Sequence, residues 1–400
     1  MEFIFFDHIS TTPMDPRVMA AMLPYFGNYY GNPSSHIHAM GIQADEGVQK
    51  ARRQVADLIN ASPEEVIFTS GGTEANNLAL KGLASVYGKK GRHLVLSEIE
   101  HFSVLNPSLT LQKQGWEVTK VPVSPCGRVE PEEVKKTLRK DTSLVAVMLA
   151  NSEIGTIQPI VEIAKVVKDH GALMFVDGIA ACGNIPVDMQ TLGADAVSLS
   201  AHNFYGPKGV GALYLRKERT LDPLIEGGFQ ERGYRSGTEN VPGIVGMGRA
   251  AELAREEMGQ RTEHLRALQK KLWEGLETSI EHLHFTGHPK ERLPGHVSFW
   301  VEFVEGESLL LFLSQNGVMA ASGSACASNL KGRDEGDLVI SHVLKAVGVP
   351  TDICQGSITF SMGKDNTLEE VEHVLGVMPK IVERLWAMSP MYADYLKQKH

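Results

Sequence analysis

The sequence is poor in cysteine, lacks any Cys-x-x-Cys pair and has no long apolar run. Four cysteines among 400 residues stand apart from one another, which excludes a zinc ribbon and a thioredoxin-type motif. No apolar stretch reaches the length that crosses a membrane, and the first residues lack the basic start and the apolar length of a signal peptide. These absences predict a cytoplasmic protein whose cysteines are free thiols.

Positive charge is also scarce relative to negative charge. The chain has 39 Lys and Arg against 48 Asp and Glu, a formal net charge of −9, so a protein that binds nucleic acid through its phosphates is not expected. The remaining composition, 42% hydrophobic and 22% charged, is ordinary for a globular protein. The length favours one large domain and one smaller domain.

Short apolar runs alternate with helical patterns along the first half of the chain. The strand-like runs are residues 66–69, 94–96, 118–123, 144–149, 173–176 and 196–199. This order predicts a mostly parallel sheet with helices on both faces. A long charged helix is expected over about 250–279, and residues 296–303 alternate like a half-buried strand. We place a large domain at 16–255 and a small α+β domain at 256–400, to which we assign residues 1–15.

Residues 198–213 are predicted to form the centre of a functional site. Two short apolar strands, 196–199 and 212–215, flank a polar, glycine-rich loop that we expect to be exposed. Loops between buried strands are where α/β proteins place ligands and chemistry. Asn203 stands at the centre of this loop.

Polar residues follow three other predicted strands. A turn containing Gly72 and Thr73 opens a helix, and such a turn suits an anion, although it is equally an ordinary helix cap. Asp177 ends a strand, where a carboxylate points into the ligand crevice of a parallel sheet or caps the next segment. His101 also follows a strand, and a lone histidine there is more often a surface residue.

Cys326 lies among small residues that precede a charged stretch. Such a loop is a poor core position, and it suits a nucleophile that moves between two sites. The alternative is an incidental exposed thiol.

Together these motifs resemble those of the NifS/IscS-type cysteine desulfurases, a branch of the class V aminotransferases. The resemblance runs from residue 3 to 390. Its motifs are residues 11–13, 31–35, 68–77, 100–101, 153–155, 176–177, 205–209, 231–238, 323–326 and 341–344. It implies the fold type I of pyridoxal phosphate (PLP) enzymes: an α/β fold with a mostly parallel seven-stranded sheet sandwiched by helices, a smaller α+β C-terminal domain, and a homodimer.

The resemblance also implies roles for single residues. Gly72 and Thr73 match the phosphate-binding turn, His101 matches the ring that stacks on PLP, and Asp177 matches the carboxylate that pairs with the pyridine nitrogen. That pairing keeps the cofactor an electron sink. Further cofactor contacts, the last of them donated across the dimer, are Ser200, His202 and Thr238.

Cys326 matches the loop cysteine that takes sulfur from L-cysteine as a persulfide, leaving L-alanine. The persulfide then passes to a scaffold or another acceptor protein in iron–sulfur cluster assembly. As a thiol near such an acceptor, Cys326 is also a possible cluster ligand, and no other metal ligand is expected.

Four pocket positions depart from the family pattern. Asn203 stands where the family has the lysine that forms the Schiff base with PLP, and an amide has no basic amine. Thr359 stands where an arginine usually binds the substrate α-carboxylate, so the charge and the bidentate fork are lost. Ala180 replaces a glutamine that bonds the phenolic oxygen of PLP. Ser152 replaces the second of two asparagines, which leaves Asn151 alone to contact cofactor and substrate.

These departures leave three functions open. The first is a sulfur-transfer enzyme of low or lost turnover, with PLP bound noncovalently or absent. The second is a dimeric partner in iron–sulfur assembly that has no desulfurase activity of its own. The third is a different chemistry on another amine or sulfur substrate, favoured by the missing carboxylate clamp at Thr359.

Overall fold

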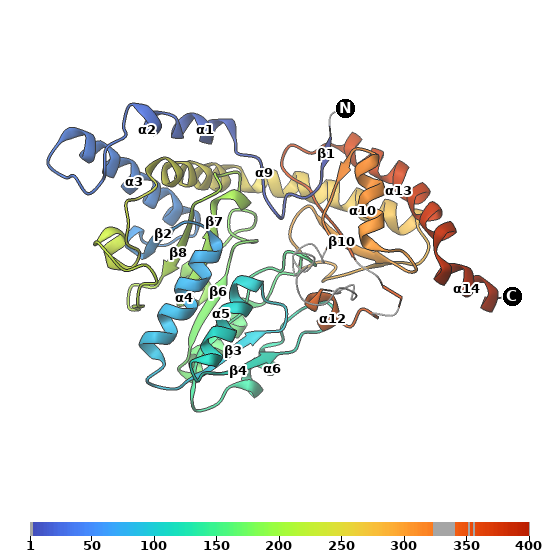
Figure 1. The fold of residues 1–400 in the computed structure, drawn as a ribbon, viewed down its shortest axis with the longest axis horizontal. Coiled ribbons are helices and arrows are strands. Elements are labelled where there is room, and N and C mark those ends of the chain that lie inside the picture. Colours follow the sequence, from blue (N-terminus) through green and yellow to red (C-terminus); the bar gives the residue numbers. More distant parts are fainter. Residues whose placement is uncertain (1–2, 323–340, 351–352, 355–356, 400) are drawn as a thin grey trace.

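The computed structural model describes residues 3–322, 341–350, 353–354 and 357–399. Cys326 and the rest of the motif at 323–326 lie outside the described residues. The described chain contains a seven-stranded sheet and, in a second unit, a three-stranded sheet, with a two-stranded pair formed by the N-terminal residues. Figure 1 shows the two units side by side, with one long helix, α9 (Val241–Ser279), running from the first into the second.

The large sheet has the strand order β2-β8-β7-β6-β5-β3-β4. Its strands are β2 (Val66–Thr69), β3 (His93–Ser97), β4 (Glu117–Val121), β5 (Thr142–Ala146), β6 (Leu173–Asp177), β7 (Ala196–Ser200) and β8 (Gly211–Leu215). The run from β4 to β7 is parallel, and β8 is antiparallel to both of its neighbours. The predicted mostly parallel α/β sheet is therefore confirmed.

Alternating side chains of these strands belong to two separate hydrophobic cores. Ile67 and Leu94 pack toward the core that contains α4 and α5, whereas their neighbours Phe68 and Val95 pack toward the core that contains α3, α7 and the start of α9. This follows from the period of two in an extended chain. Because both faces are covered, every residue of β3, β5 and β6 is buried, as expected for parallel strands. The antiparallel edge strand β2 is buried as well.

The remaining elements are short helices around the sheet and the elements of the second unit. The helices are α1 (Pro16–Met22), α2 (Pro24–Gly27), α3 (Ala39–Leu58), η1 (Pro63–Glu65), α4 (Gly72–Tyr87), α5 (Phe102–Lys113), α6 (Pro131–Thr137), α7 (Ile160–His170), α8 (Met189–Leu192), η2 (Ala201–Asn203), η3 (Gln230–Gly233), α10 (Gly306–Gln315), α12 (His342–Ala346), α13 (Leu368–Met388) and α14 (Pro390–Lys399). The strands are β1 (Ile4–Phe5), β9 (Leu283–Phe285), β10 (His296–Val301), β11 (Val318–Met319) and β12 (Ile358–Ser361). No helix in the described ranges is long and apolar enough to cross a membrane.

The second unit has its own core. Its sheet has the order β12-β10-β9, and its buried side chains come from these strands, the end of α9, α10 and α13, with Phe6 from the N-terminal segment. The prediction that residues 296–303 form a half-buried strand is wrong in its burial: all of β10 is buried. The reason is that both faces of the strand are covered: Phe299 packs in the core of the second unit, whereas Trp300 packs with Met148 of the large unit.

Helix α9 begins earlier than the sequence suggests. It starts at Val241 rather than near residue 250, because the Asn240 side chain accepts from the Gly243 N–H and Pro242 occupies the first turn. Its first half is buried against the large sheet and carries few charges, which hides the helical pattern. The division we placed at residue 255 falls inside this helix.

Candidate functional site

The Asp177 carboxylate, at the carboxyl end of β6, is held by groups from three elements. Asn76 on α4 donates its Nδ2 to Asp177 Oδ2 at 2.8 Å. The backbone N–H of Ile179 donates to Oδ1 at 3.0 Å, and Ser198 Oγ on β7 lies 3.4 Å from the same oxygen. The side chain is buried, so these donors replace the water that a carboxylate needs.

The same asparagine connects Asp177 to His101. Asn76 Nδ2 also donates to Ser103 Oγ at 2.7 Å, and Ser103 Oγ lies 2.7 Å from His101 Nδ1. The backbone N–H of Ser103 donates to that nitrogen as well, which makes His101 the cap of α5. Because Nδ1 accepts, the neutral ring carries its proton on Nε2. The imidazole is therefore fixed in orientation while its ring stays exposed.

The glycine turn before α4 opens onto a cavity of about 390 Å³. Gly71 has φ +154°, and a Cβ at Gly72 would lie 2.3 Å from Ile179 Cδ1, so both positions require glycine. The cavity is lined by, among others, Ser10, Thr11, Gly72, Thr73, His202 and Lys208. The free N–H groups at the start of this long helix face an anion site.

Buried polar atoms without partners gather at this cavity. Thr11 Oγ1, Ser200 Oγ and His202 Nδ1 are buried and have no hydrogen-bond partner among the described residues. Burial, together with the charge of Lys208, lowers the pKa of His202. Unpaired buried polar groups are costly and rare, so these atoms indicate an oxygen-rich ligand at the glycine turn.

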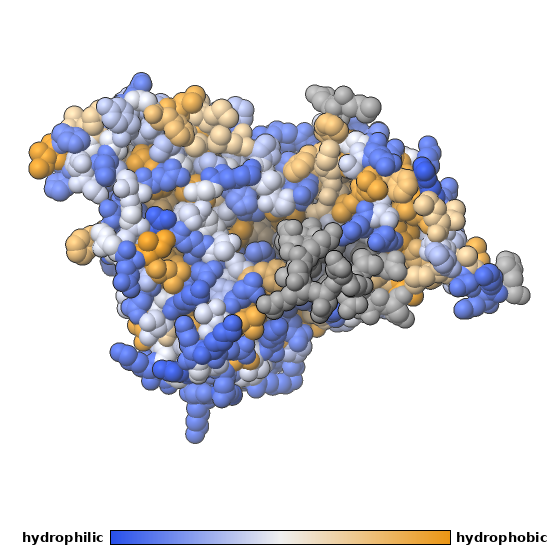
Figure 2. Space-filling model, in the orientation of Figure 1, coloured by the Kyte–Doolittle hydropathy of each residue, from blue (hydrophilic) through white to orange (hydrophobic). Residues whose placement is uncertain are grey.

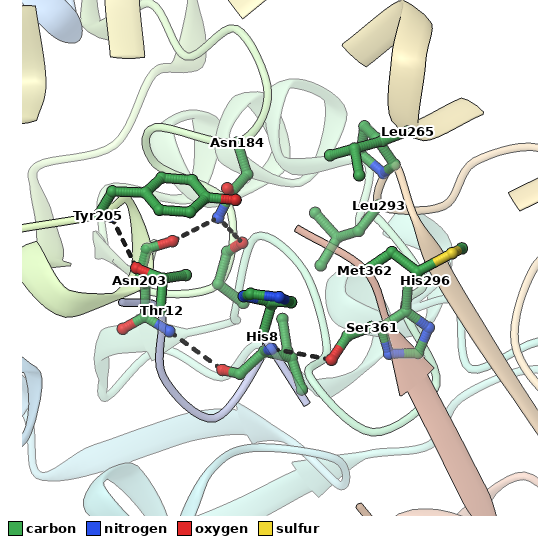
Figure 3. A pocket seen from close by; sticks show the side chains of 13 residues that line it. His8, Thr12, Asn184, Asn203, Tyr205, Leu265, Leu293, His296, Ser361 and Met362 are labelled. Carbon is green, nitrogen blue, oxygen red and sulfur yellow. Dashed lines mark hydrogen bonds between the residues drawn. The ribbon is translucent and has the colours of Figure 1, made fainter. Parts of the chain in front are cut away.

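Asn203 is buried, and the prediction of an exposed loop around it is wrong. The N-terminal segment crosses this turn: Thr12 donates its N–H and its Oγ1 to the His202 carbonyl, and Tyr205 N–H donates to Thr12 Oγ1. The Asn203 amide donates to the Ile9 carbonyl at 3.1 Å. Figure 3 shows the bonds of Asn203 to Ile9 and of Tyr205 to Thr12 beside a small cavity of about 40 Å³.

Thr359 also bonds to a backbone carbonyl. It lies on β12, is buried, and donates its Oγ1 to the carbonyl oxygen of Glu153 at 3.0 Å. The residue opposite it on β10 is Ser298, whose Oγ lies 3.3 Å from the guanidinium of Arg292. Arg292 is buried, and burial lowers its pKa to about 9. Its other N–H groups bond to the carbonyls of residues 286 and 288, so it does not replace the missing arginine fork.

The remaining residues that the sequence predicts at the site are Asn151, Ser152, Ala180 and Thr238. The side-chain amide of Asn151 bonds to backbone groups: Nδ2 donates to the Ile99 carbonyl, and Oδ1 accepts from the N–H groups of residues 153 and 154. The Ser152 carbonyl accepts from a histidine of β10. Ala180 lines the small cavity beside Asn203. Thr238 is exposed and does not line the larger cavity.

The structure therefore brings together Asp177 and His101 through a shared asparagine, and Gly72, Thr73, Ser200 and His202 at the glycine turn. Thr238 and Asn151 do not line the cavity at the glycine turn. Asn76 and Ser103 were not predicted from the sequence. Their only sequence signal is that each lies near the start of a helix that follows a strand. No cluster of three or more metal-ligating side chains occurs in the part of the chain that is described.

Comparisons with known proteins show the family to which the chain is similar. A model of the class-V aminotransferases matches residues 4–374. The chain is 46% identical to a cysteine desulfurase IscS of Methanosarcina thermophila, over 97% of this chain and 94% of that protein. It is 45% identical to cysteine desulfurase IscS 1 of Archaeoglobus fulgidus, over 97% and 99%. Among solved structures, a NifS-like protein aligns with a TM-score of 0.88 at 39% identity, covering 95% of this chain and 99% of that one.

The tie between Asn203 and the N-terminal segment leads to a prediction. Replacing Asn203 with Ala removes one donor and leaves the Ile9 carbonyl unpaired, which costs about 1 kcal/mol. We expect faster hydrogen exchange for residues 9–12, while Asn60→Ala, which removes an exposed amide contact to Asp188, leaves it unchanged. Unchanged protection in Asn203→Ala would contradict the tie.

Proposed function

Because the chain belongs to the class-V aminotransferases and, within them, to the cysteine desulfurases of the NifS/IscS type, we propose that it binds PLP and transfers sulfur in iron–sulfur cluster assembly. The observation that carries the proposal is the set of unpaired buried polar atoms beside the glycine turn, next to the fixed Asp177 and His101. These residues fit PLP at its phosphate, its ring nitrogen and its ring face.

Matching groups are available for the phosphate and for the ring nitrogen of the cofactor. The helix-opening N–H groups at Gly72 and Thr73, with Ser200 and His202, would hold the phosphate. Asp177 would hold the protonated ring nitrogen, which makes bound PLP an electron sink. Cys326 would receive the sulfur of L-cysteine as a persulfide and pass it to an acceptor protein, leaving L-alanine.

Residue 203 determines how the cofactor is held and how fast the reaction runs. Asn203 offers no amine for a covalent link, and its amide nitrogen is already bonded to Ile9. We therefore propose noncovalent PLP. The loss of a positioned proton-transfer group lowers turnover by roughly 10²–10⁴-fold, and the neutral Thr359 weakens the hold on a substrate carboxylate.

Absorption spectroscopy tests the mode of binding. Protein mixed with PLP is expected to show a cofactor band that disappears on gel filtration and is not fixed to the chain by borohydride. Asn203→Lys is expected to retain a band that borohydride does fix. If borohydride fixes the cofactor to a lysine of the unmodified protein, such as Lys208, another amine forms the covalent link to PLP.

Sulfide release from L-cysteine tests the reaction. With added PLP, Asn203→Lys is expected to release sulfide at least roughly 10²-fold faster than the unmodified protein, because it regains a basic amine. Cys326→Ala should abolish the gain. Equal rates would show that residue 203 matters little. If neither form releases sulfide, the result would contradict the proposed enzyme activity and favour a dimeric partner without desulfurase activity.

We also propose a homodimer, supported by apolar side chains on one face. Met19, Leu23 and Phe26, on or beside α1 and α2, are exposed, as are Ile37 and Phe229. Figure 2 shows apolar residues gathered over α1 and α2 at the upper left. An apolar patch of this kind indicates an interface. The resemblance implies that Thr238 contacts the cofactor of the partner chain, and Thr238 does not line the cavity of its own chain.

The oligomeric state tests this interface. Light scattering is expected to give twice the chain mass for the unmodified protein, and Phe26→Glu is expected to dissociate it, because a charge replaces a side chain that is 65% exposed in the single chain. Leu109→Glu, at a residue that is 52% exposed on α5, is the matched control and should remain dimeric. A monomeric unmodified protein would contradict the proposal.

A further inference from the structure

Glu153 lies where the two units meet. It follows Asn151 in the turn after β5, and its backbone N–H donates to Asn151 Oδ1. The residue as a whole is partly buried, and its carboxyl group has no ion-pair partner within the described part of the chain. Elements of the second unit reach it from two directions.

The first contact comes from the residues just after position 340. Ser341 Oγ lies 2.5 Å from Glu153 Oε2. The Val343 N–H donates to the same Ser341 oxygen and so caps α12, which leaves the hydroxyl proton to be donated to Glu153. Beside it, His342 Nε2 lies 3.0 Å from the Glu100 carbonyl. The start of α12 is therefore fastened to the large unit.

The second contact comes from the residues just before position 323. Ala321 and Thr359 exchange backbone hydrogen bonds at 3.2 and 2.8 Å. Thr359 in turn donates its hydroxyl to the Glu153 carbonyl at 3.0 Å. The chain on either side of residues 323–340 is thus connected to one residue, to its carboxyl group on one side and to its carbonyl group on the other.

We propose that Glu153 is a positioning residue that holds both flanks of the segment carrying Cys326 on the large unit. It holds Ser341 directly, and it holds Ala321 through Thr359. The fastening itself needs neither cofactor nor turnover. Its consequence for sulfur transfer rests on the proposed function, because only there does Cys326 carry sulfur. Thr359, which stands at the family's arginine, then serves as a tie between the units.

The surroundings of Glu153 make this tie sensitive to pH. Burial raises the pKa of Glu153 to about 7, and the Ser341 hydroxyl is the group that opposes this shift. The titratable groups around it offer no counter-charge. Burial lowers the pKa of His342 on α12 and that of His296 on β10, the latter to about 3, and it raises the pKa of Glu100 to about 8. The nearby Arg292 has its donors bonded to other groups.

The sign of the effect follows from linkage. The pKa of Glu153 in the fastened state is above its ordinary value of 4.5, so the fastened state binds the proton more tightly than the released state. The fastening is therefore strongest at low pH and weakens as pH rises through 7. With these two values, release becomes about tenfold easier between pH 6 and pH 8.

Hydrogen exchange of residues 341–349 tests the proposal in protein without cofactor or substrate. After correction for intrinsic exchange, the opening equilibrium of the unmodified protein is expected to rise about tenfold from pH 6 to pH 8. Glu153→Gln keeps an acceptor for Ser341 and should show slow exchange with no such rise. Thr359→Val should exchange faster at every pH and keep the rise, because it loses only the second tie.

A matched control is Glu305→Gln on the N-terminal side of α10. Glu305 is also a partly buried glutamate that accepts a serine hydroxyl, from Ser308 at 2.6 Å, and its replacement should leave exchange at 341–349 unchanged. A flat pH profile in the unmodified protein, or the same rise in Glu153→Gln, would overturn the proposal. Neither result bears on cofactor binding or sulfide release, so failure here is separate from failure of the proposed function.

Discussion

The shared hydrogen bonds of Asn76 determine the geometry of the site. A carboxylate buried at the end of β6 must be surrounded by donors, and the most direct donor is Asn76, one turn into α4. That contact fixes the rotation of α4 and therefore the direction of the glycine turn that opens it. Because the same amide nitrogen reaches Ser103, it also fixes the start of α5 and the ring of His101.

The positions of most strands and the polar residues at their ends could be predicted from the sequence, because both depend on local periodicity and on the position of polar residues after apolar runs. Asp177, Gly72 and Thr73 were found in this way. The contact of Asn76 with Asp177 spans 101 residues and leaves no local pattern. The burial of Asn203 was missed for the same reason, since Thr12, which covers its turn, is 190 residues from His202.

Asn203 and Thr359, two of the positions that we predict to depart from the family pattern, both use their polar side chains inside the protein. Asn203 donates to the Ile9 carbonyl, and Thr359 donates to the Glu153 carbonyl. Each is buried, so its donor needs a partner inside the protein. The Asn203 Oδ1 atom has no partner among the described residues. A backbone carbonyl can serve because it has two lone pairs and often uses only one of them. Both substitutions thus turn a position at the ligand site into a contact between distant parts of the chain.

The retained and the altered residues lie on different parts of the fold. Gly72, Thr73, His101 and Asp177 stand at the edge of the parallel sheet, where the two covered faces and the shared amide of Asn76 hold them rigid. The altered residues stand at the turn covered by the N-terminal segment and at the junction of the two units. In the proposed function, the groups at the sheet edge would bind the cofactor, whereas the groups at the junction would serve proton transfer and substrate recognition. The two sets are structurally independent, since none of the hydrogen bonds that hold Asp177 passes through Asn203 or Thr359.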